Sequence, residues 1–245
     1  MTVAWEGAGW EQLAPRVGRC RLPVWDCTVG LVAGADSALL IDAGSSLREG
    51  ARLRAQARGL LGGGRGVTHL ALTHAHFDHV LGAAALAGAE VIGAAGLDTV
   101  LATGGAELRA DAVRNGLDAG EADGAVDRLV RPGRLIAGER TLDLGGGVRA
   151  LLADVGPGHT AHDLAVLVTD VPGTPATVFC GDLVEESGEP QAGPDAVPAR
   201  WPAALDRLLA LGGEDARYVP GHGAVVDAAF VRAQRDALAA RFGVS

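Results

Sequence analysis

Histidine and aspartate side chains gather in one short segment of the chain, from Thr73 to His79. The segment reads Thr-His-Ala-His-Phe-Asp-His, and four of the seven histidines of the protein lie between His69 and His79. Neutral imidazoles together with a carboxylate are the ligands that zinc prefers in proteins. A functionless polar strand end would not concentrate so scarce a residue. The segment therefore predicts a metal site.

The residues on either side of this segment predict how it is positioned. Residues 67–72 are apolar enough to form a buried strand, and residues 80–86 have the composition of a helix. The histidine segment would then occupy a tight turn at the end of a strand. Such a turn lets alternate side chains converge on one point, as a metal site requires.

This turn resembles the H-x-H-x-D-H signature of the metallo-β-lactamase superfamily, whose zinc hydrolases include glyoxalase II, lactonases and zinc β-lactamases. Four further segments resemble motifs of that family in the same order along the chain. They are an early aspartate at Asp42, a third-histidine loop at 156–160, a strand end with a bridging aspartate at 179–183, and a last-histidine loop at 220–223. The resemblance covers roughly residues 25–240, and five ordered motifs are far more specific than one.

The resemblance implies a binuclear centre with three ligands for a first metal, three for a second and one bridging carboxylate. In that order, these are His74, His76 and His159; Asp78, His79 and His222; and Asp182. Two cations that share a water lower its pKa and give a metal-bridging hydroxide near neutral pH. The catalytic residue would be Asp78, which would orient that hydroxide or pass its proton to the leaving group. Two zinc ions are expected, although nitrogen and oxygen ligands also accept iron or manganese.

Composition and length limit the class of protein. A chain of 245 residues, 48% of them hydrophobic, with a mean hydropathy of +0.21, is globular. No linker interrupts it, so we expect one domain over residues 1–245. The resemblance implies an α/β fold, the αββα four-layer sandwich, with metals at one edge. We expect a cytoplasmic protein, because the chain has no ~18-residue apolar run, no secretory signal pattern and only three cysteines.

Hydrophobic periodicity and turn residues predict individual elements. The final helix would be capped by Asp227, with Phe230, Ala233, Ala237 and Leu238 on its buried face. The other expected elements are strands at 29–32, 38–41, 90–93, 148–155, 164–169 and 177–180, helices at 47–61 and from Trp201 onwards, and helical content over 97–130.

The charge of the chain limits its partners. The net charge is −9 and there is no basic stripe, which argues against nucleic acid because phosphate backbones require clustered cations. All 21 basic residues are arginine, so lysine-dependent chemistry is excluded. We expect a small-molecule substrate, with neither nucleic acid nor a membrane as partner, and the oligomeric state is left open.

Several other residues have two interpretations at this stage. Asp42 is expected to orient a ligand imidazole and not to coordinate, and His69 is expected to pack and not to coordinate. His162 lies three positions after His159, where some glyoxalase-like relatives have a histidine at four, so it either faces the substrate or lies in a surface loop. Trp25 and Trp201 either line the pocket or pack in the core.

The substrate is suggested mainly by one departure from the family. Zinc β-lactamases with a cysteine ligand place a lysine three positions after it to hold the drug's carboxylate. Here Glu185 stands three positions after Asp182, and a carboxylate there would repel an anionic drug. The leading hypothesis is a binuclear zinc hydrolase of a small neutral or apolar ester, thioester, lactone or amide. The alternatives are a mononuclear iron oxygenase of the persulfide dioxygenase type, β-lactamase activity, or a non-catalytic binding module. Residues 97–130 and 186–200 are the expected pocket walls.

Overall fold

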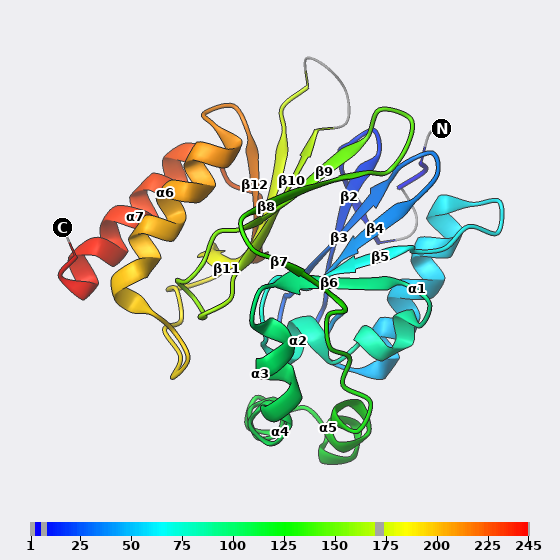
Figure 1. The fold of residues 1–245 in the computed structure, drawn as a ribbon, viewed down its shortest axis with the longest axis horizontal. Coiled ribbons are helices and arrows are strands. Elements are labelled where there is room, and N and C mark those ends of the chain that lie inside the picture. The colour runs from blue at the N-terminus through cyan, green and yellow to red at the C-terminus, as the bar shows by residue number, and fades with distance from the viewer. Residues whose placement is uncertain (1–2, 6–8, 170–173, 245) are drawn as a thin grey trace.

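Two β-sheets form the middle of the molecule, with helices on the outer face of each (Figure 1). The computed structural model describes residues 3–5, 9–169 and 174–244. One buried cluster fills the space between the sheets, with Ile41 and Ile92 from one sheet and Val166 and Phe179 from the other. A second cluster lies between the first sheet and the helices that cover it, and a third lies between the second sheet and the helices that cover that sheet. This is the predicted αββα arrangement of layers.

The first sheet has the order β1-β2-β3-β4-β5-β6-β7. Neighbours from β1 to β4 are antiparallel and those from β4 to β7 are parallel. Its strands are β1 (Glu11–Ala14), β2 (Val17–Arg21), β3 (Thr28–Ala33), β4 (Ala38–Ile41), β5 (His69–Ala71), β6 (Glu90–Ala94) and β7 (Arg134–Ile136).

The second sheet has the order β12-β11-β10-β9-β8, and only the β11–β12 pair is parallel. Its strands are β8 (Glu139–Asp143), β9 (Arg149–Asp154), β10 (Leu164–Thr169), β11 (Thr177–Glu185) and β12 (Arg217–His222). The helices are α1 (Leu47–Leu61), α2 (Phe77–Val80), α3 (Leu97–Thr103), α4 (Gly105–Arg114), α5 (Ala119–Val126), α6 (Trp201–Gly212) and α7 (Ala228–Phe242), with short 3-10 helices η1 (Ala83–Leu86) and η2 (Pro198–Arg200).

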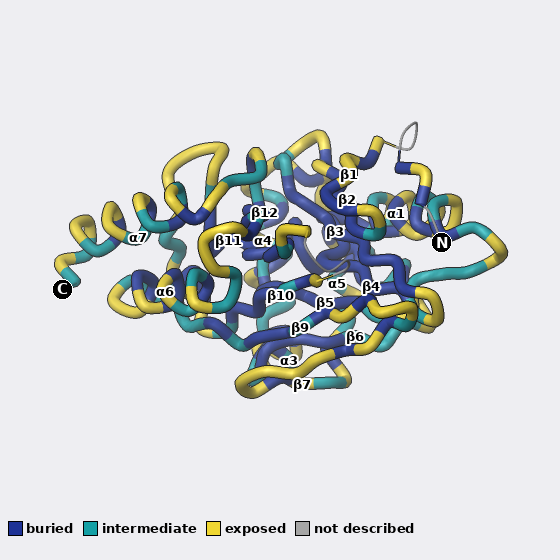
Figure 2. The backbone as a smooth tube through the Cα atoms, turned by 90° about the horizontal axis from the view of Figure 1, so that it is seen from above, coloured by how far each residue is buried: buried dark blue, intermediate teal, exposed yellow. Residues whose placement is uncertain are grey.

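Helix α1 shows how local sequence sets an element's bounds. Ser46 is its N-cap, and the Ser46 hydroxyl accepts a hydrogen bond from the Glu49 amide. Gly62, with φ 61°, ends the helix because a glycine adopts this backbone conformation without steric cost. The helix predicted at 47–61 is confirmed, because α1 spans Leu47–Leu61. Figure 2 shows the resulting burial, with dark strands inside and helices exposed on their outer turns.

Two predicted elements need correction. The helix expected at 80–86 is divided into α2 and η1, which are four residues each. In α7 the cap at Asp227 is confirmed, and of the predicted face Leu238 is buried and Phe230 packs against the core, but the other two residues are misplaced. Ala233 and Ala237 are exposed, and the buried positions are Ala228, Val231, Gln234 and Leu238. Hydrophobicity could not indicate this face, because one of its buried residues is an amide.

Strand ends place the histidine segment at one edge of the first sheet. Strands β4 and β5 are parallel, so their carboxyl ends meet at the same edge. Asp42 directly follows β4, and the predicted ligand segment follows β5. In the second sheet, β11 contains Asp182 and the parallel β12 ends at His222. Among the described residues no helix is long and apolar enough to cross a bilayer. The cytoplasmic location stays a prediction.

Candidate metal centre

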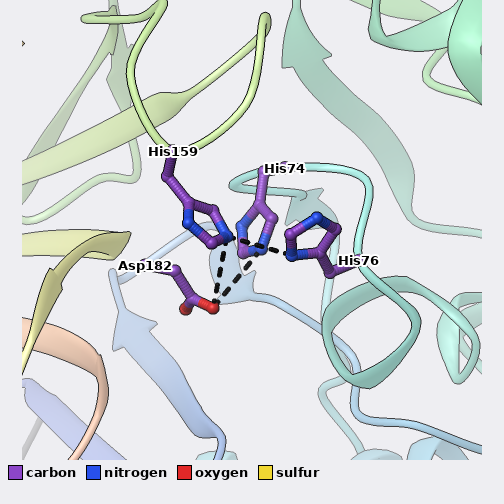
Figure 3. Close-up of side chains that lie close together, drawn as sticks. All are labelled: His74, His76, His159 and Asp182. Carbon is purple, nitrogen blue, oxygen red and sulfur yellow. Dashed lines mark hydrogen bonds and ion pairs between the residues drawn. The ribbon is translucent and has the colours of Figure 1, made fainter. Parts of the chain in front are cut away.

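Three histidines and a carboxylate form a first group of possible ligands (Figure 3). His74 and His76 come from the turn after β5, His159 from the loop between β9 and β10, and Asp182 from β11. Nε2 of His159 lies 3.0 Å from Nδ1 of His76. Oδ2 of Asp182 lies 3.6 Å from Nε2 of His74 and 3.5 Å from Nε2 of His159. Spacings of this size suit ligands that share one ion about 2 Å from each.

A second group lies on the other side of Asp182. Its atoms are Nε2 of His79, 3.1 Å from Oδ1 of Asp182, and Nε2 of His222, 3.3 Å from Oδ2. Asp78 belongs with them, because its Oδ2 lies 3.3 Å from Nε2 of His222 and 3.7 Å from Nε2 of His79. All seven residues that the resemblance assigned as ligands are therefore neighbours, and Asp182 is common to both groups.

Unsatisfied polar atoms test whether these residues fit a metal ion. Among the described residues, three buried atoms of this centre lack a hydrogen-bond partner: Nε2 of His74, Nδ1 of His159 and Oδ1 of Asp182. The first and the last face the other ligands across the distances given above. Buried polar atoms normally find a partner because leaving one unpaired costs free energy. A cation held between the groups would satisfy both atoms, so the donor set fits a metal.

A buried carboxylate holds the turn that carries the histidines. Asp42 has a positive φ of 63°, and its Oδ1 accepts a hydrogen bond from the Thr73 amide at 2.8 Å. Its Oδ2 accepts from the Thr73 hydroxyl and lies 2.8 Å from Nδ1 of His79. With Nδ1 donating to Asp42, Nε2 of His79 keeps a lone pair for a metal. The contact expected between Asp42 and a ligand imidazole is present, and Asp42 lies outside the ligand groups.

Three other imidazoles, those of His74, His222 and His76, are oriented in the same way. Nδ1 of His74 lies 2.9 Å from the Thr73 hydroxyl, and Nδ1 of His222 lies 2.7 Å from the Trp25 carbonyl oxygen. His76 is turned around, with its Nε2 3.1 Å from Oδ2 of Asp195 and its Nδ1 toward His159. Each outer contact leaves the other ring nitrogen directed to the centre.

The charges of the two groups differ. Burial lowers the pKa of His74 well below its usual value and that of His159 to about 4. Burial also acts to lower the pKa of His222, but Asp182 and Asp78 outweigh it and raise the pKa to about 12. Burial alone would raise the pKa of Asp182, yet His79 and His74 hold it well below its usual value. The carboxylates of the centre are thus ionised, and in the metal-free protein protonated imidazoles pair with them where a cation could bind.

Comparison with known proteins now identifies the family. The family profile described as the metallo-β-lactamase superfamily matches residues 22–222. The chain belongs to the metallo-β-lactamase superfamily. No curated protein gave a significant match.

Solved structures of this superfamily share the fold. One is the metallo-β-lactamase FIM-1 from Pseudomonas aeruginosa in a mono-zinc form, with a TM-score of 0.68 and 20% identity over 100% of this chain and 98% of that chain. A metallo-β-lactamase from Erythrobacter litoralis with β-mercaptoethanol in its active site has a TM-score of 0.68 and 19% identity, covering 95% and 96%. DIM-1 exposed to ceftazidime has a TM-score of 0.69 and 17% identity, covering 95% and 96%. At these identities the likeness establishes the metallo-β-lactamase fold.

Two histidines of this superfamily member lie outside both ligand groups. His69 on β5 lies beside Thr68 and Glu90, with Nδ1 2.9 Å from the Thr68 hydroxyl, as expected for a packed residue. The His162 imidazole lies against Gly96, where an added Cβ would come within 2.2 Å of its Cε1. Among the described residues, His162 belongs to none of the groups that could hold a metal.

The two tryptophans pack near the centre in different ways. Trp201 is fully buried, and its ring centroid lies 5.3 Å from that of His159. Trp25 packs edge-on against Phe77 and donates a hydrogen bond from its indole to the Asn115 carbonyl oxygen. Trp25 therefore joins the β2–β3 turn to the 97–130 segment.

Sequence reasoning missed three residues that touch the ligands. They are Thr73, Asp195 and Cys27, whose Sγ lies 3.7 Å from Nδ1 and 3.8 Å from Nε2 of His79. Thr73 adjoins the motif and was open to prediction as a hydroxyl beside a ligand. Asp195 and Cys27 meet their partners only through the tertiary fold, so no local pattern marks them.

The Glu185 side chain, on which the substrate argument depends, is hydrogen-bonded within its own loop. Its Oε1 accepts hydrogen bonds from the amide and the hydroxyl of Ser187, at 3.0 and 2.6 Å. Burial raises the pKa of Glu185, and Ser187 and His222 act in the opposite direction. The carboxylate is thus held by its own loop, beside the register partner His222.

Proposed function

We propose that this protein is a binuclear zinc-dependent hydrolase of a small neutral or apolar ester, thioester, lactone or amide. The observation that supports this most is the position of Asp182 between the two ligand groups. A carboxylate between two cations offsets their mutual repulsion and sets their separation at ~3.5–4 Å in two-metal sites. His74, His76 and His159 would hold one ion, and Asp78, His79 and His222 the other.

The chain's own residues have distinct tasks in this proposal. When bound, the metals would supply a water of lowered pKa and an electrophile for the substrate carbonyl. Asp42, Thr73 and Asp195 keep the imidazoles in the orientation that leaves one ring nitrogen free. Asp78 would accept the proton of the attacking water and return it to the leaving group. Burial alone would raise its pKa, but His79 and His222 lower it below the usual value, which suits a base that is ionised at neutral pH.

The surroundings of the centre favour a substrate without negative charge. Glu186, beside Glu185, accepts a hydrogen bond from the Ala224 amide next to the His222 loop. Carboxylates at this end of the centre disfavour an anionic β-lactam. The similar β-lactamase structures support the fold alone.

A hydrolysis panel tests the proposal. Zinc-loaded protein would be assayed with matched neutral and anionic esters, thioesters, lactones and β-lactams, and zinc would be counted by elemental analysis. We expect about two zinc equivalents and turnover of neutral substrates. One metal equivalent at saturation would contradict the binuclear assignment. Oxygen consumption by iron-loaded protein with a persulfide, without hydrolysis, would favour the oxygenase alternative, and a preference for β-lactams would favour a β-lactamase.

A further inference from the structure

The pairing of β11 with β12 is irregular between Phe179 and Glu185, the stretch that contains the residue shared by both ligand groups. Gly181 pairs with Pro220 of β12, and the next pair is Glu185 with His222. Three residues of β11, Asp182 to Val184, thus lie opposite the single residue Gly221. Such a bulge redirects a side chain and is frequent beside active sites. We call residues 182–184 the Asp182 bulge.

The bulge brings the carboxylate directly over the neighbouring strand. A Cβ added to Gly221 would lie 1.8 Å from Oδ1 of Asp182. Glycine at 221 therefore makes room for the carboxylate. The position of the Asp182 carboxylate therefore depends on the backbone of β12 at Gly221 as well as on that of β11.

A bulge leaves backbone groups without partners in the sheet, and here two side chains supply them. The Leu183 carbonyl oxygen accepts hydrogen bonds from the Gln234 amide at 2.7 Å and from the Trp201 indole at 3.0 Å. The Glu185 amide donates to the side-chain oxygen of Gln234 at 3.0 Å. Gln234 thus binds the backbone just after Asp182 through both ends of its amide.

The surroundings of Gln234 give it no other polar partner in the described structure. It is 7% exposed and lies on the buried face of α7 with Ala228, Val231 and Leu238. Burying an amide costs free energy unless its hydrogen bonds are made. An apolar residue would pack at this position without that cost, so the polar side chain is explained by the bulge.

We propose that Gln234 is a positioning residue that fixes the Asp182 bulge, and with it the carboxylate between the two metals. This inference rests on the proposed function, in which Asp182 is a metal ligand. Trp201 helps to hold the same segment, because its indole donates a hydrogen bond to the Leu183 carbonyl oxygen and its ring packs against His159. Helices α6 and α7, on the outer face of the second sheet, would thereby control a centre at its edge (Figure 1).

The test compares Gln234→Met with Val231→Ala, a matched change at a fully buried position on the same face of α7. Metal affinity would be measured by competition with a chromophoric chelator, and hydrogen exchange would be followed over residues 181–186. We expect Gln234→Met to weaken metal binding by about 10- to 100-fold, as for other outer contacts of a metal site, and to accelerate exchange. Val231→Ala should lower thermal stability and leave both readings unchanged.

Each outcome decides the inference. Wild-type affinity and exchange in Gln234→Met, or equal losses in Val231→Ala, would overturn it while the proposed function stands. If the wild-type protein takes up no metal, the proposed function fails. In that case, hydrogen exchange over residues 181–186 that is the same in Gln234→Met as in wild type would separately overturn the positioning role. Should Gln234→Met not fold, Gln234→Asn keeps an amide too short to bridge Leu183 and Glu185, and the same two readings apply.

Discussion

The two ligand groups of one centre differ in charge. The group of His74, His76 and His159 contains imidazoles that burial keeps neutral at His74 and His159. The group of His79 and His222 is surrounded by the carboxylates of Asp42, Asp78 and Asp182. Burial acts to lower the pKa of both imidazoles, but Cys27 and these carboxylates raise that of His79, and Asp182 and Asp78 raise that of His222. In the first group only His76 has a raised pKa, because its contact with Asp195 outweighs its burial. In the proposed function, metal binding should therefore release more protons from the second group than from the first.

The largest effect is expected from a substitution of Asp182, the residue that both ligand groups share. Asp182→Ala should lower kcat/KM by more than about 100-fold, beyond the range for outer contacts, because it removes a ligand from both sites. Zinc content and hydrolysis would be measured together. Glu139→Ala, which removes an exposed carboxylate on β8, is the control and should change neither. Near-wild-type activity of Asp182→Ala would contradict a bridging role.

The next prediction compares Asp42 and Asp195, each of which contacts the outer ring nitrogen of a histidine in one of the two groups. Asp42→Asn should weaken metal binding by the second group by about 10- to 100-fold, since Asp42 is 2% exposed and holds both His79 and Thr73. Asp195→Asn should weaken the first group by only a few fold, because the Asp195 side chain is 49% exposed and its contact with His76 is screened by water. Titration with a competing chelator checks both variants. The reverse order would mean that burial does not set the strength of these contacts.

The pH dependence of metal binding distinguishes the groups directly. In the first group His159, with its pKa lowered to about 4, is already neutral between pH 5 and 8. Only His76 has a raised pKa there, because its contact with Asp195 outweighs its burial, so affinity at the first group should rise by no more than about tenfold per pH unit. His222, with its pKa raised to about 12, is protonated over the same range and would release that proton when a metal binds. Affinity at the second group should therefore rise about tenfold per pH unit for each proton released. Calorimetry in buffers of different ionisation enthalpy counts the protons, and none released for either ion would contradict the assignment.

The smallest effect concerns substrate charge at the His222 side. Glu185→Lys should raise kcat/KM for anionic relative to neutral substrates by no more than about two- to fivefold, the range for solvent-screened charges. The effect is small because the Glu185 carboxylate is held by Ser187. Glu139→Lys is the matched charge change at an exposed site. A ratio that does not move in low salt would remove Glu185 from the argument against an anionic substrate.

The sequence predicted the ligand set because short motifs encode it. Four segments with fixed local spacing indicated the seven residues that the fold brings together, and their coordination of metal stays a prediction. The helix at 47–61 was equally local, since Ser46 and Gly62 mark its ends. Short strands such as β1 and β7 carry too few residues for a periodic signal and were not predicted.

What the sequence could not predict are the contacts that support the ligands. Nothing in the sequence marks Gln234, and its burial follows only from a bulge in a strand about fifty positions earlier. The contacts of Asp195 with His76 and of Cys27 with His79 likewise join distant segments. Such pairs depend on how the two sheets are assembled, which no local pattern encodes.

The spread of the ligands along the chain has a consequence for biosynthesis. His74 is made long before His222 and Gln234, and at ~5–20 residues per second the interval is on the order of 10 seconds. During that time the nascent chain has its first histidines but lacks the residues that complete the site and hold Asp182. In the proposed function, full metal loading would therefore follow translation of α7, because only then are all seven ligands and the contacts of Gln234 in place.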